Sequence, residues 1–446
     1  MRRMLILSLF VLACGLALAA PFSLATFTPT VARFDNILYI PARSLAEMIG
    51  AAIAEDPNTG VTSLKLGEKS VTFTPGKAGE KAKPFTLFHG GLAVPLQSCA
   101  DALGIEVADA RNTVTLKLPG DRPPISLTVE ENQGNNARDC YDDSHMLFMM
   151  KPDGSGLRRL SYRNADGIGI GMVSFAPDGS FLLTYDNYCQ VLMRPTASRE
   201  ERVVGGIDGA DFGTTLPVSA DGKSYFVHWK NLVSRVLLAG GLKQPICIAN
   251  EYALSPIGKY LAAVQRKPGG VGQVILITLE DYSQQELGVG STPLFTPDGN
   301  KLVFHLAGQD KEGKPVDALM LYTIQPANDK KIYPLSGMRN IPMAFSTDGK
   351  ELLFNTDAKH GLCVLDLVTG KARALAPWQD DMTYLAALFT ADNKAVIALQ
   401  AYGDLFRVNA DGTGLTRLTK GFSIDAFTLT PGGEYVVFLG VPKDKQ

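Results

Sequence analysis

The sequence predicts a mainly β protein in which a seven-bladed β-propeller follows a small α+β domain of two repeats. Three observations predict this fold. A turn motif recurs seven times at intervals of 36 to 50 residues in the last two thirds of the chain. The hairpin sequence at residues 147–161 recurs at 405–419, and a helix-containing pattern occurs twice near the N-terminus. A chain of 446 residues also exceeds one ordinary core, so several domains or one large repeat array are expected.

The composition excludes several classes of protein. With 46% hydrophobic and 20% charged residues, the chain is not intrinsically disordered. Its 44 Gly and 26 Pro follow no period, which excludes collagen and disfavours a helical bundle. The 43 basic and 45 acidic residues give a net charge of −2, which argues against a protein that binds nucleic acid by neutralising phosphates. We expect no cofactor and no nucleic-acid partner.

The first residues predict export. Residues 1–3 are basic, residues 4–16 are apolar, and 17–19 supply the small-x-small pattern of a signal peptidase site, so residues 1–19 are a predicted signal peptide. An uncleaved anchor is an alternative, but the apolar run of at most 17 residues is short for a membrane span. A lipoprotein signal is another, because residues 11–14 resemble a lipobox ending at Cys14. No later stretch is apolar and long enough to span a bilayer. We expect a periplasmic, secreted or cell-surface protein.

A duplicated unit follows at residues 20–118. Residues 39–50 recur at 93–104, each copy reading as a short strand, a Pro, an amphipathic helix and a terminating Gly. Pro suits the start of a helix and Gly its end. Alternating segments at 62–66 and 114–118 read as strands. Two such units can bury their helices against a shared sheet.

This duplicated pattern resembles the copper amine oxidase N-terminal-like domain over about residues 27–118. The resemblance implies a module of exported bacterial and cell-wall proteins that does not itself hold copper. The first copy has the usual Arg of that family at Arg43, while the second has Gln97. Nine basic and nine acidic residues balance between 21 and 118, so no polyanion-binding face is expected. We expect an attachment or spacer module, and a purely structural role stays open.

Residues 119–143 are predicted to form a linker with one short strand at 125–129. The propeller is expected over 144–446, where each turn motif ends in Gly or Asn, residues that supply a positive φ at low energy. Apolar runs follow most of these turns, as in strands buried between stacked blades. The turn carboxylates Asp178, Asp298 and Asp348 are therefore predicted to be structural. The seven motifs are residues 175–179, 219–222, 255–258, 295–299, 345–349, 389–393 and 430–433.

The repeated hairpin predicts how the ring closes. Residues 147–161 and 405–419 align without gaps, and 8 of the 15 positions are identical. The first copy precedes the first turn motif, whereas the last turn motif, at 430–433, has no hairpin after it. The N-terminal hairpin is therefore expected to complete the C-terminal blade and remove free sheet edges.

These motifs resemble the TolB-like propeller repeat over residues 144–440. The resemblance implies TolB as a six-bladed periplasmic relative whose N-terminal domain differs from the one here. The role of TolB with its own partners is therefore not expected for this chain. Similar repeats form the propeller half of prolyl-oligopeptidase-like peptidases, but no Gly-x-Ser-x-Gly nucleophile motif occurs in this chain.

The cysteines predict no disulfide framework, because the five that remain after cleavage are an odd and scattered set. Cys247 and Cys363 lie within apolar runs and are expected in the core. Cys140 and Cys189 lie in more polar segments and could pair, while Cys99 is the fifth.

The histidines raise an enzymatic alternative. Oligogalacturonate lyases resemble seven-bladed propellers with related repeats and a His-rich metal site. His228 and His305 occupy equivalent places, each six residues after its turn Gly, while His145 and His360 lie elsewhere in the repeat. No His-x-His pair is present, so we expect structural roles and no bound metal. The alternative is a metal-dependent lyase or hydrolase acting on envelope or extracellular polysaccharide.

The charge pattern predicts an interaction site. The segments that enter the innermost strands of such a propeller line one mouth of its channel, and here they carry seven acids against Arg163, Arg339 and Lys420. We expect an electronegative mouth that receives a cation or a basic segment of a partner. The alternative is that these carboxylates only stabilise turns. The acids are Asp166, Asp208, Asp211, Glu251, Asp380, Asp381 and Asp425.

The sequence thus predicts an exported, monomeric, non-enzymatic binding or scaffold protein. Its propeller would present a surface to an envelope or extracellular protein or peptide. Binding of a cell-wall polymer through residues 20–118 is the other non-enzymatic possibility.

Overall fold

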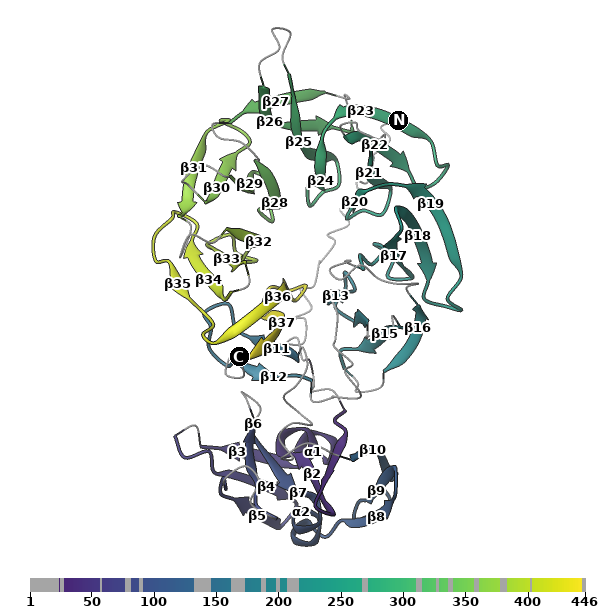
Figure 1. Cartoon of the computed structure of the whole chain (residues 1–446), viewed down its shortest axis with the longest axis vertical. Helices are drawn as coiled ribbons and strands as arrows, with labels where there is room; N and C mark the ends of the chain where they lie inside the picture. Colours follow the sequence, from purple (N-terminus) through teal and green to yellow (C-terminus); the bar gives the residue numbers. More distant parts are fainter. Residues whose placement is uncertain are drawn as a thin grey trace, which may run out of the picture.

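A computed structural model describes most of the chain. The described residues are 24, 28–56, 58–76, 82–87, 91–131, 146–161, 173–185, 190–197, 201–206, 216–266, 272–309, 315–325, 329–335, 340–356, 361–377, 383–401 and 403–442. Within these ranges the protein is mainly β, with a ring of sheets and a smaller mixed domain beside it (Figure 1). No helix in the described ranges is long and apolar enough to cross a membrane.

The N-terminal domain contains a seven-stranded sheet of order β6-β7-β2-β1-β10-β9-β8 and a three-stranded sheet β3-β4-β5. Strand β1 pairs with β2 in antiparallel and with β10 in parallel fashion. The segment predicted as a linker, residues 119–143, therefore contributes a strand to this sheet. The elements are β1 (Val31–Phe34), β2 (Ile37–Pro41), α1 (Ala42–Ile49), β3 (Ala52–Glu55), β4 (Thr62–Leu66), β5 (Lys69–Phe73), β6 (Phe85–Leu87), β7 (Gly91–Pro95), α2 (Leu96–Leu103), β8 (Glu106–Ala110), β9 (Thr113–Lys117) and β10 (Ile125–Glu131).

The two helices show why the sequence pattern repeats. Each begins directly after a Pro, whose fixed φ suits helix entry, and ends at a Gly in the left-handed region. Gly50 has a φ of 70° and Gly104 a φ of 73°. The apolar faces of α1 and α2 pack into one core with strands from both repeats. The predicted α+β arrangement of two units is thus confirmed.

The propeller consists of seven antiparallel sheets among the described residues, which confirms the predicted seven blades (Figure 1). Blade 2 has three strands and a single bridge, Val218 to Tyr225, in the innermost place. Blade 1 is β13 (Ser174–Phe175), β14 (Phe181–Tyr185), β15 (Gln190–Pro195) and β16 (Arg202–Gly206); blade 2 is β17 (Ser224–Trp229), β18 (Leu232–Leu237) and β19 (Lys243–Ile248); blade 3 is β20 (Glu251–Leu254), β21 (Tyr260–Arg266), β22 (Gly272–Thr278) and β23 (Gln284–Val289). Blade 4 is β24 (Ser291–Phe295), β25 (Lys301–Gln309), β26 (Pro315–Thr323) and β27 (Lys330–Pro334); blade 5 is β28 (Ile341–Phe345), β29 (Glu351–Asn355), β30 (Leu362–Asp366) and β31 (Ala372–Ala376); blade 6 is β32 (Tyr384–Phe389), β33 (Ala395–Gln400), β34 (Leu405–Asn409) and β35 (Thr416–Arg417).

Blade 7 is built from both ends of the propeller sequence, as predicted. It comprises β36 (Phe422–Leu429), β37 (Val436–Pro442), β11 (Met146–Met150) and β12 (Arg158–Arg159). Strand β11 pairs with β37, placing Phe148 opposite Phe438 with ring centroids 5.3 Å apart. The repeated hairpins also have the same structure: the Leu147 amide donates to Ser161 Oγ at 2.9 Å, and the Leu405 amide to Thr419 Oγ1 at 2.9 Å.

The turn motifs explain the recurring Ser/Thr-x-Asp-Gly sequence. Ser346 Oγ donates to Asp348 Oδ1 at 2.7 Å, and the same carboxylate accepts the Lys350 amide at 3.1 Å. Gly349, with a φ of 68°, completes the turn at low energy. The pairs Ser219–Asp221, Thr296–Asp298 and Thr390–Asp392 repeat this arrangement. Asp298 and Asp348 therefore stabilise turns, as predicted.

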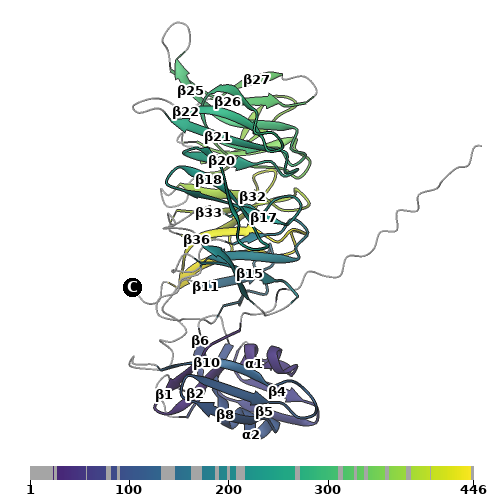
Figure 2. The same cartoon turned by 90° about the vertical axis from the view of Figure 1, so that its right-hand side faces the viewer.

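The N-terminal domain lies at one end of the ring (Figure 2). Contacts made by Arg158 join the two parts. Arg158 of β12 donates to the Leu24 carbonyl at 2.6 Å and lies 3.6 Å from Glu47 of α1. Leu24 is fully buried in a cluster of propeller side chains that includes Leu147 and Leu182. A residue that precedes the first strand of the N-terminal domain thus packs into the propeller.

Candidate functional site

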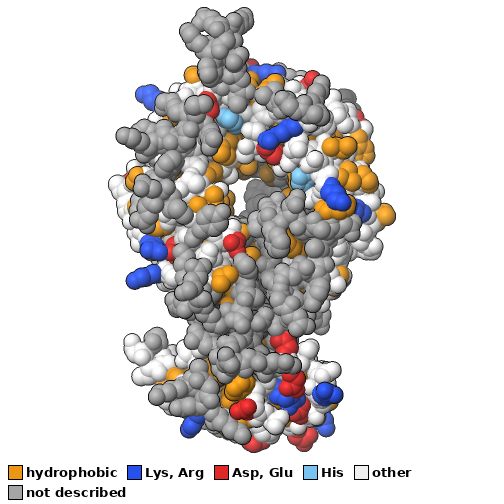
Figure 3. Space-filling model, in the orientation of Figure 1, with side chains coloured by type: hydrophobic (Ala, Val, Ile, Leu, Met, Phe, Trp, Pro, Cys, Tyr) orange, Lys and Arg blue, Asp and Glu red, His pale blue; other side chains and the backbone are white. Residues whose placement is uncertain are grey.

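The predicted acidic mouth is described in part. Successive blades are related by rotation about the channel, so the first residues of the innermost strands lie on one face of the ring. Figure 3 shows the central opening, with hydrophobic side chains along part of its edge. Glu251 and Asp425 are described, and both lie near the starts of innermost strands. Asp166, Asp208, Asp211, Asp380 and Asp381 lie outside the described residues, as do Arg163 and Arg339.

Glu251 connects two blades. Its Oε1 accepts from Arg266 Nη2 at 2.6 Å within blade 3, and its Oε2 accepts the Thr292 amide of blade 4 at 2.7 Å. Thr292 has a φ of 54°, which is unusual for a β-branched residue and is held by this bond. The negative charge of Glu251 is therefore largely compensated by Arg266, and its carboxylate fixes the backbone at the mouth.

Asp425 lies in a different setting, at a β-bulge. The register of β36 with β37 shifts between Ile424 and Ala426, and the register of β32 with β33 shifts at the equivalent place beside Leu385. Bulges redirect side chains at the rims of sheets. Asp425 is exposed and Leu385 is 54% exposed, and the two strands are in contact. Ile341, the first residue of β28 in the next blade, is 38% exposed. The mouth thus combines a carboxylate with exposed aliphatic side chains, which the charge pattern of the sequence did not predict.

His305 belongs to a polar chain at the same end of blade 4. Its Nδ1 lies 3.3 Å from Ser291 Oγ and its Nε2 lies 3.1 Å from Asp317 Oδ1. Asn340 Nδ2 donates to the same Asp317 oxygen at 2.7 Å. The arrangement holds blades 4 and 5 together.

His228, at the equivalent place in blade 2, has a different partner. Its Nε2 lies 2.7 Å from the Ala249 carbonyl oxygen, in the connection to blade 3. His145 and His360 lie outside the described residues. Among the residues that the structure describes, no group of three or more His, Cys, Asp or Glu side chains is arranged to hold a metal ion.

The thiols of the described cysteines do not ionise readily. Burial raises the pKa of Cys99 to about 12 and the pKa of Cys247 and Cys363 to about 11. Their thiols therefore stay protonated at neutral pH. Cys363 is buried as predicted and Cys247 is half-buried. Cys140 and Cys189, whose pairing was considered, lie outside the described residues.

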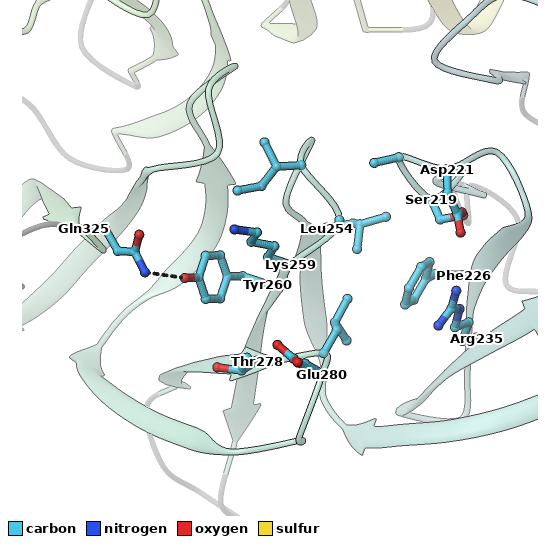
Figure 4. Close-up of a pocket in the computed structure, with 14 residues that line it drawn as sticks. Ser219, Asp221, Phe226, Arg235, Leu254, Lys259, Tyr260, Thr278, Glu280 and Gln325 are labelled. Atoms are coloured by element: carbon cyan, nitrogen blue, oxygen red, sulfur yellow. Dashed lines mark hydrogen bonds between the residues drawn. The ribbon is translucent and has the colours of Figure 1, made fainter.

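A cavity of about 530 Å³ opens on the turn face, at the other end of the innermost strands, between blades 2 and 3 (Figure 4). Arg235 and Asp221 line it from blade 2, and Ile257, Lys259 and Glu280 line it from blade 3. The sequence pattern did not predict this site. One signal was present: the third turn motif reads Ser-Pro-Ile-Gly at 255–258 and lacks the Asp found at that place in most other motifs.

No protein-family model and no curated protein matches the chain. Solved structures are similar at the level of fold. One is a protein assigned as TolB from Agrobacterium tumefaciens, with 14% identity and a TM-score of 0.41 over 67% of this chain and 98% of that one. Another is an oligogalacturonate lyase from Vibrio parahaemolyticus, with 11% identity and a TM-score of 0.47 over 64% and 93%. The β-propeller domain of Cps50 (Swd1) from Myceliophteria thermophila has 13% identity and a TM-score of 0.45 over 60% and 95%.

Proposed function

We propose that the protein is an exported, monomeric, non-enzymatic binding or scaffold protein of the cell envelope, whose propeller binds a protein or peptide at the channel mouth. The observation that carries this proposal is the exposed, bulged Leu385 on the strand beside the one that carries Asp425. An aliphatic side chain 54% exposed on a rigid strand loses unfavourable contact with water when a partner covers it.

The mouth fits a partner segment that carries both apolar and basic side chains. Ile341 and Leu385 offer the apolar contact, and Asp425 offers a negative charge. The predicted acids Asp380 and Asp381 belong to the segment just before β32 and would add to this charge. An electronegative rim would raise the association rate and favour partners with basic segments. The aliphatic groups would supply most of the binding free energy.

We further propose that the N-terminal domain is a copper amine oxidase N-terminal-like module that acts as an attachment or spacer. The support is the matching structure of the two repeats, in which a strand, a Pro and an eight-residue helix end at a left-handed Gly. The Arg of the first copy, Arg43, is paired with Glu55, and in the second copy Gln97 instead bonds Asp101 at 2.7 Å. Each copy thus keeps an interaction from the first turn of its helix to an acidic side chain.

The proposed site is tested by crosslinking from the native cell envelope, with the mature chain from residue 20 as bait. We expect a discrete partner that Leu385→Arg and the double variant Asp380→Asn, Asp381→Asn each retain at least fivefold less. Val203→Arg is the matched control, because Val203 is 57% exposed but lies on the outer strand β16. Equal retention by all variants, or no partner for a folded bait, would refute binding at the mouth.

A further inference from the structure

The turn face carries a second candidate site, independent of the channel mouth. The cavity between blades 2 and 3 has a volume of about 530 Å³, within the range of small-ligand pockets. Figure 4 shows Asp221 and Arg235 on the blade 2 side, with Lys259, Tyr260 and Glu280 on the blade 3 side. Two blades therefore contribute side chains of opposite charge to one hollow.

One wall of this cavity departs from the repeat. In four other turns a Ser or Thr hydroxyl donates to the Asp two residues later. In blade 3 the Asp is replaced by Ile257, and Ser255, which is only 1% exposed, has an Oγ with no hydrogen-bond partner. The substitution weakens the turn, because a buried hydroxyl is left unsatisfied. Positions where a sequence breaks its own structural rule are often functional.

The replacement also places an aliphatic side chain at the surface. Ile257 is 37% exposed and lines the cavity together with Leu254 and the ring of Tyr260. An Asp at this place would make the wall polar, as it is beside the equivalent turn of blade 2. Stability therefore does not account for Ile257, whereas an apolar group bound in the cavity would.

The charged side chains of this cavity differ in how they are used. Asp221 accepts from Ser219 Oγ and the Lys223 amide, so its carboxylate is occupied by the turn. In the part of the chain that the structure describes, the Lys259 and Glu280 side chains make no hydrogen bond or ion pair, and both are exposed at the cavity. Arg235 also lines the cavity, and its Nε donates to Ser224 Oγ at 2.8 Å. Lys259 and Glu280 are thus one positive and one negative group that remain available to a ligand.

We propose that this cavity binds a short peptide with free termini and an apolar side chain. Lys259 would bind its α-carboxylate, Glu280 would bind its α-ammonium group, and the apolar side chain would pack on Ile257, Leu254 and Tyr260. This site lies on the face opposite the proposed partner surface, so the propeller would bind a small peptide and a larger partner at separate places.

Calorimetric titration of the full mature chain with leucyl-leucine tests the ligand chemistry. We expect N-acetyl-leucyl-leucine and leucyl-leucine amide each to bind at least tenfold more weakly, because each lacks one terminal charge. Glycylglycine, which has both charges and no apolar side chain, should also bind at least tenfold more weakly. No binding of leucyl-leucine at millimolar concentration, or equal binding of all four probes, would overturn the proposal.

Variants of the wall separate binding from folding. Ile257→Asp restores the repeat, so we expect it to raise the melting temperature and weaken leucyl-leucine binding at least tenfold. Lys259→Gln should weaken binding with no change in melting temperature. Ile332→Asp, at a residue 51% exposed on β27, is the control and should bind as the wild type does. Wild-type affinity of Ile257→Asp and Lys259→Gln would refute the site whatever the partner experiment at the mouth shows.

Discussion

At the residue scale, the recurring sequence of the propeller is found mainly in its turns. In the turn at 346–349 the hydroxyl, the Asp and the Gly have separate tasks: the hydroxyl and carboxylate satisfy backbone groups, and the Gly supplies the positive φ. These roles could be predicted from the Asp-Gly sequence alone. The functional consequence of losing the Asp at Ile257 could not, because it depends on a cavity formed with the neighbouring blade.

The turn carboxylates make the stability of the propeller depend on pH. The Ser346 hydroxyl and the Lys350 amide hold the pKa of Asp348 below its ordinary value of 3.8, and Asp178, Asp221 and Asp392 are lowered similarly by hydroxyl and amide donors. Because the pKa is lower in the folded state, this stabilisation is present above the unfolded pKa and is lost as the pH falls through the folded value. We expect the urea midpoint of unfolding to be constant near neutral pH and to decrease below about pH 4.

One substitution tests the role of a single turn carboxylate. Asp348→Ala should lower the free energy of unfolding by about 1 kcal/mol at pH 7 and by less at pH 3. An equal loss at both pH values would contradict this role.

At the element scale, the ring and its closure could be predicted because they follow from order along the chain. One hairpin precedes the first turn motif, and no hairpin follows the last. Only the pairing of the N-terminal hairpin with the last blade leaves no free sheet edge, and β11 pairs with β37 in this way. The parallel pairing of β10 with β1 could not be predicted, since those strands are far apart in sequence and neither carries a pattern that selects the other. Residues 119–143 were predicted as a linker with one short strand at 125–129, and β10 (Ile125–Glu131) lies at that strand.

Closure predicts a large effect of one buried aromatic residue. Phe148 of β11 is fully buried, with its ring 5.1 Å from that of Phe422 and 5.3 Å from that of Phe438. Phe148→Ala should reduce the free energy of unfolding by about 3–5 kcal/mol, because it opens a cavity where the two ends of the propeller meet. Urea unfolding followed by tryptophan fluorescence measures this loss. Leu415→Ala, in the loop of the equivalent hairpin of blade 6, is a control that should lose much less. A Phe148→Ala loss below about 1 kcal/mol would show that β11 does not hold the ring closed.

At the scale of the whole molecule, the candidate sites lie where blades meet. Glu251 joins blades 3 and 4, Leu385 and Asp425 lie on adjacent innermost strands, and the turn-face cavity is shared by blades 2 and 3. The sequence predicted which end of each strand would form the mouth, because that follows from the order of turn and strand. It could not predict the bulges that expose Leu385 and Asp425, because a register shift depends on the pairing of two strands.

The junction between the two domains gives the last prediction. Leu24 is fully buried against propeller side chains, and its carbonyl accepts from Arg158, which also lies beside Glu47 of α1. Leu24→Asp would place a charge in an apolar cluster, so we expect the segment to leave the propeller and release the contact between the domains. Because Leu24 precedes the first strand of the N-terminal domain, both domains should keep their circular dichroism. Small-angle X-ray scattering should then give a larger radius of gyration than the wild type, whereas Ile332→Asp should not change it. An unchanged radius for Leu24→Asp would mean that other contacts hold the domains together, and the N-terminal module would then be a fixed part of the propeller rather than a spacer attached through this segment.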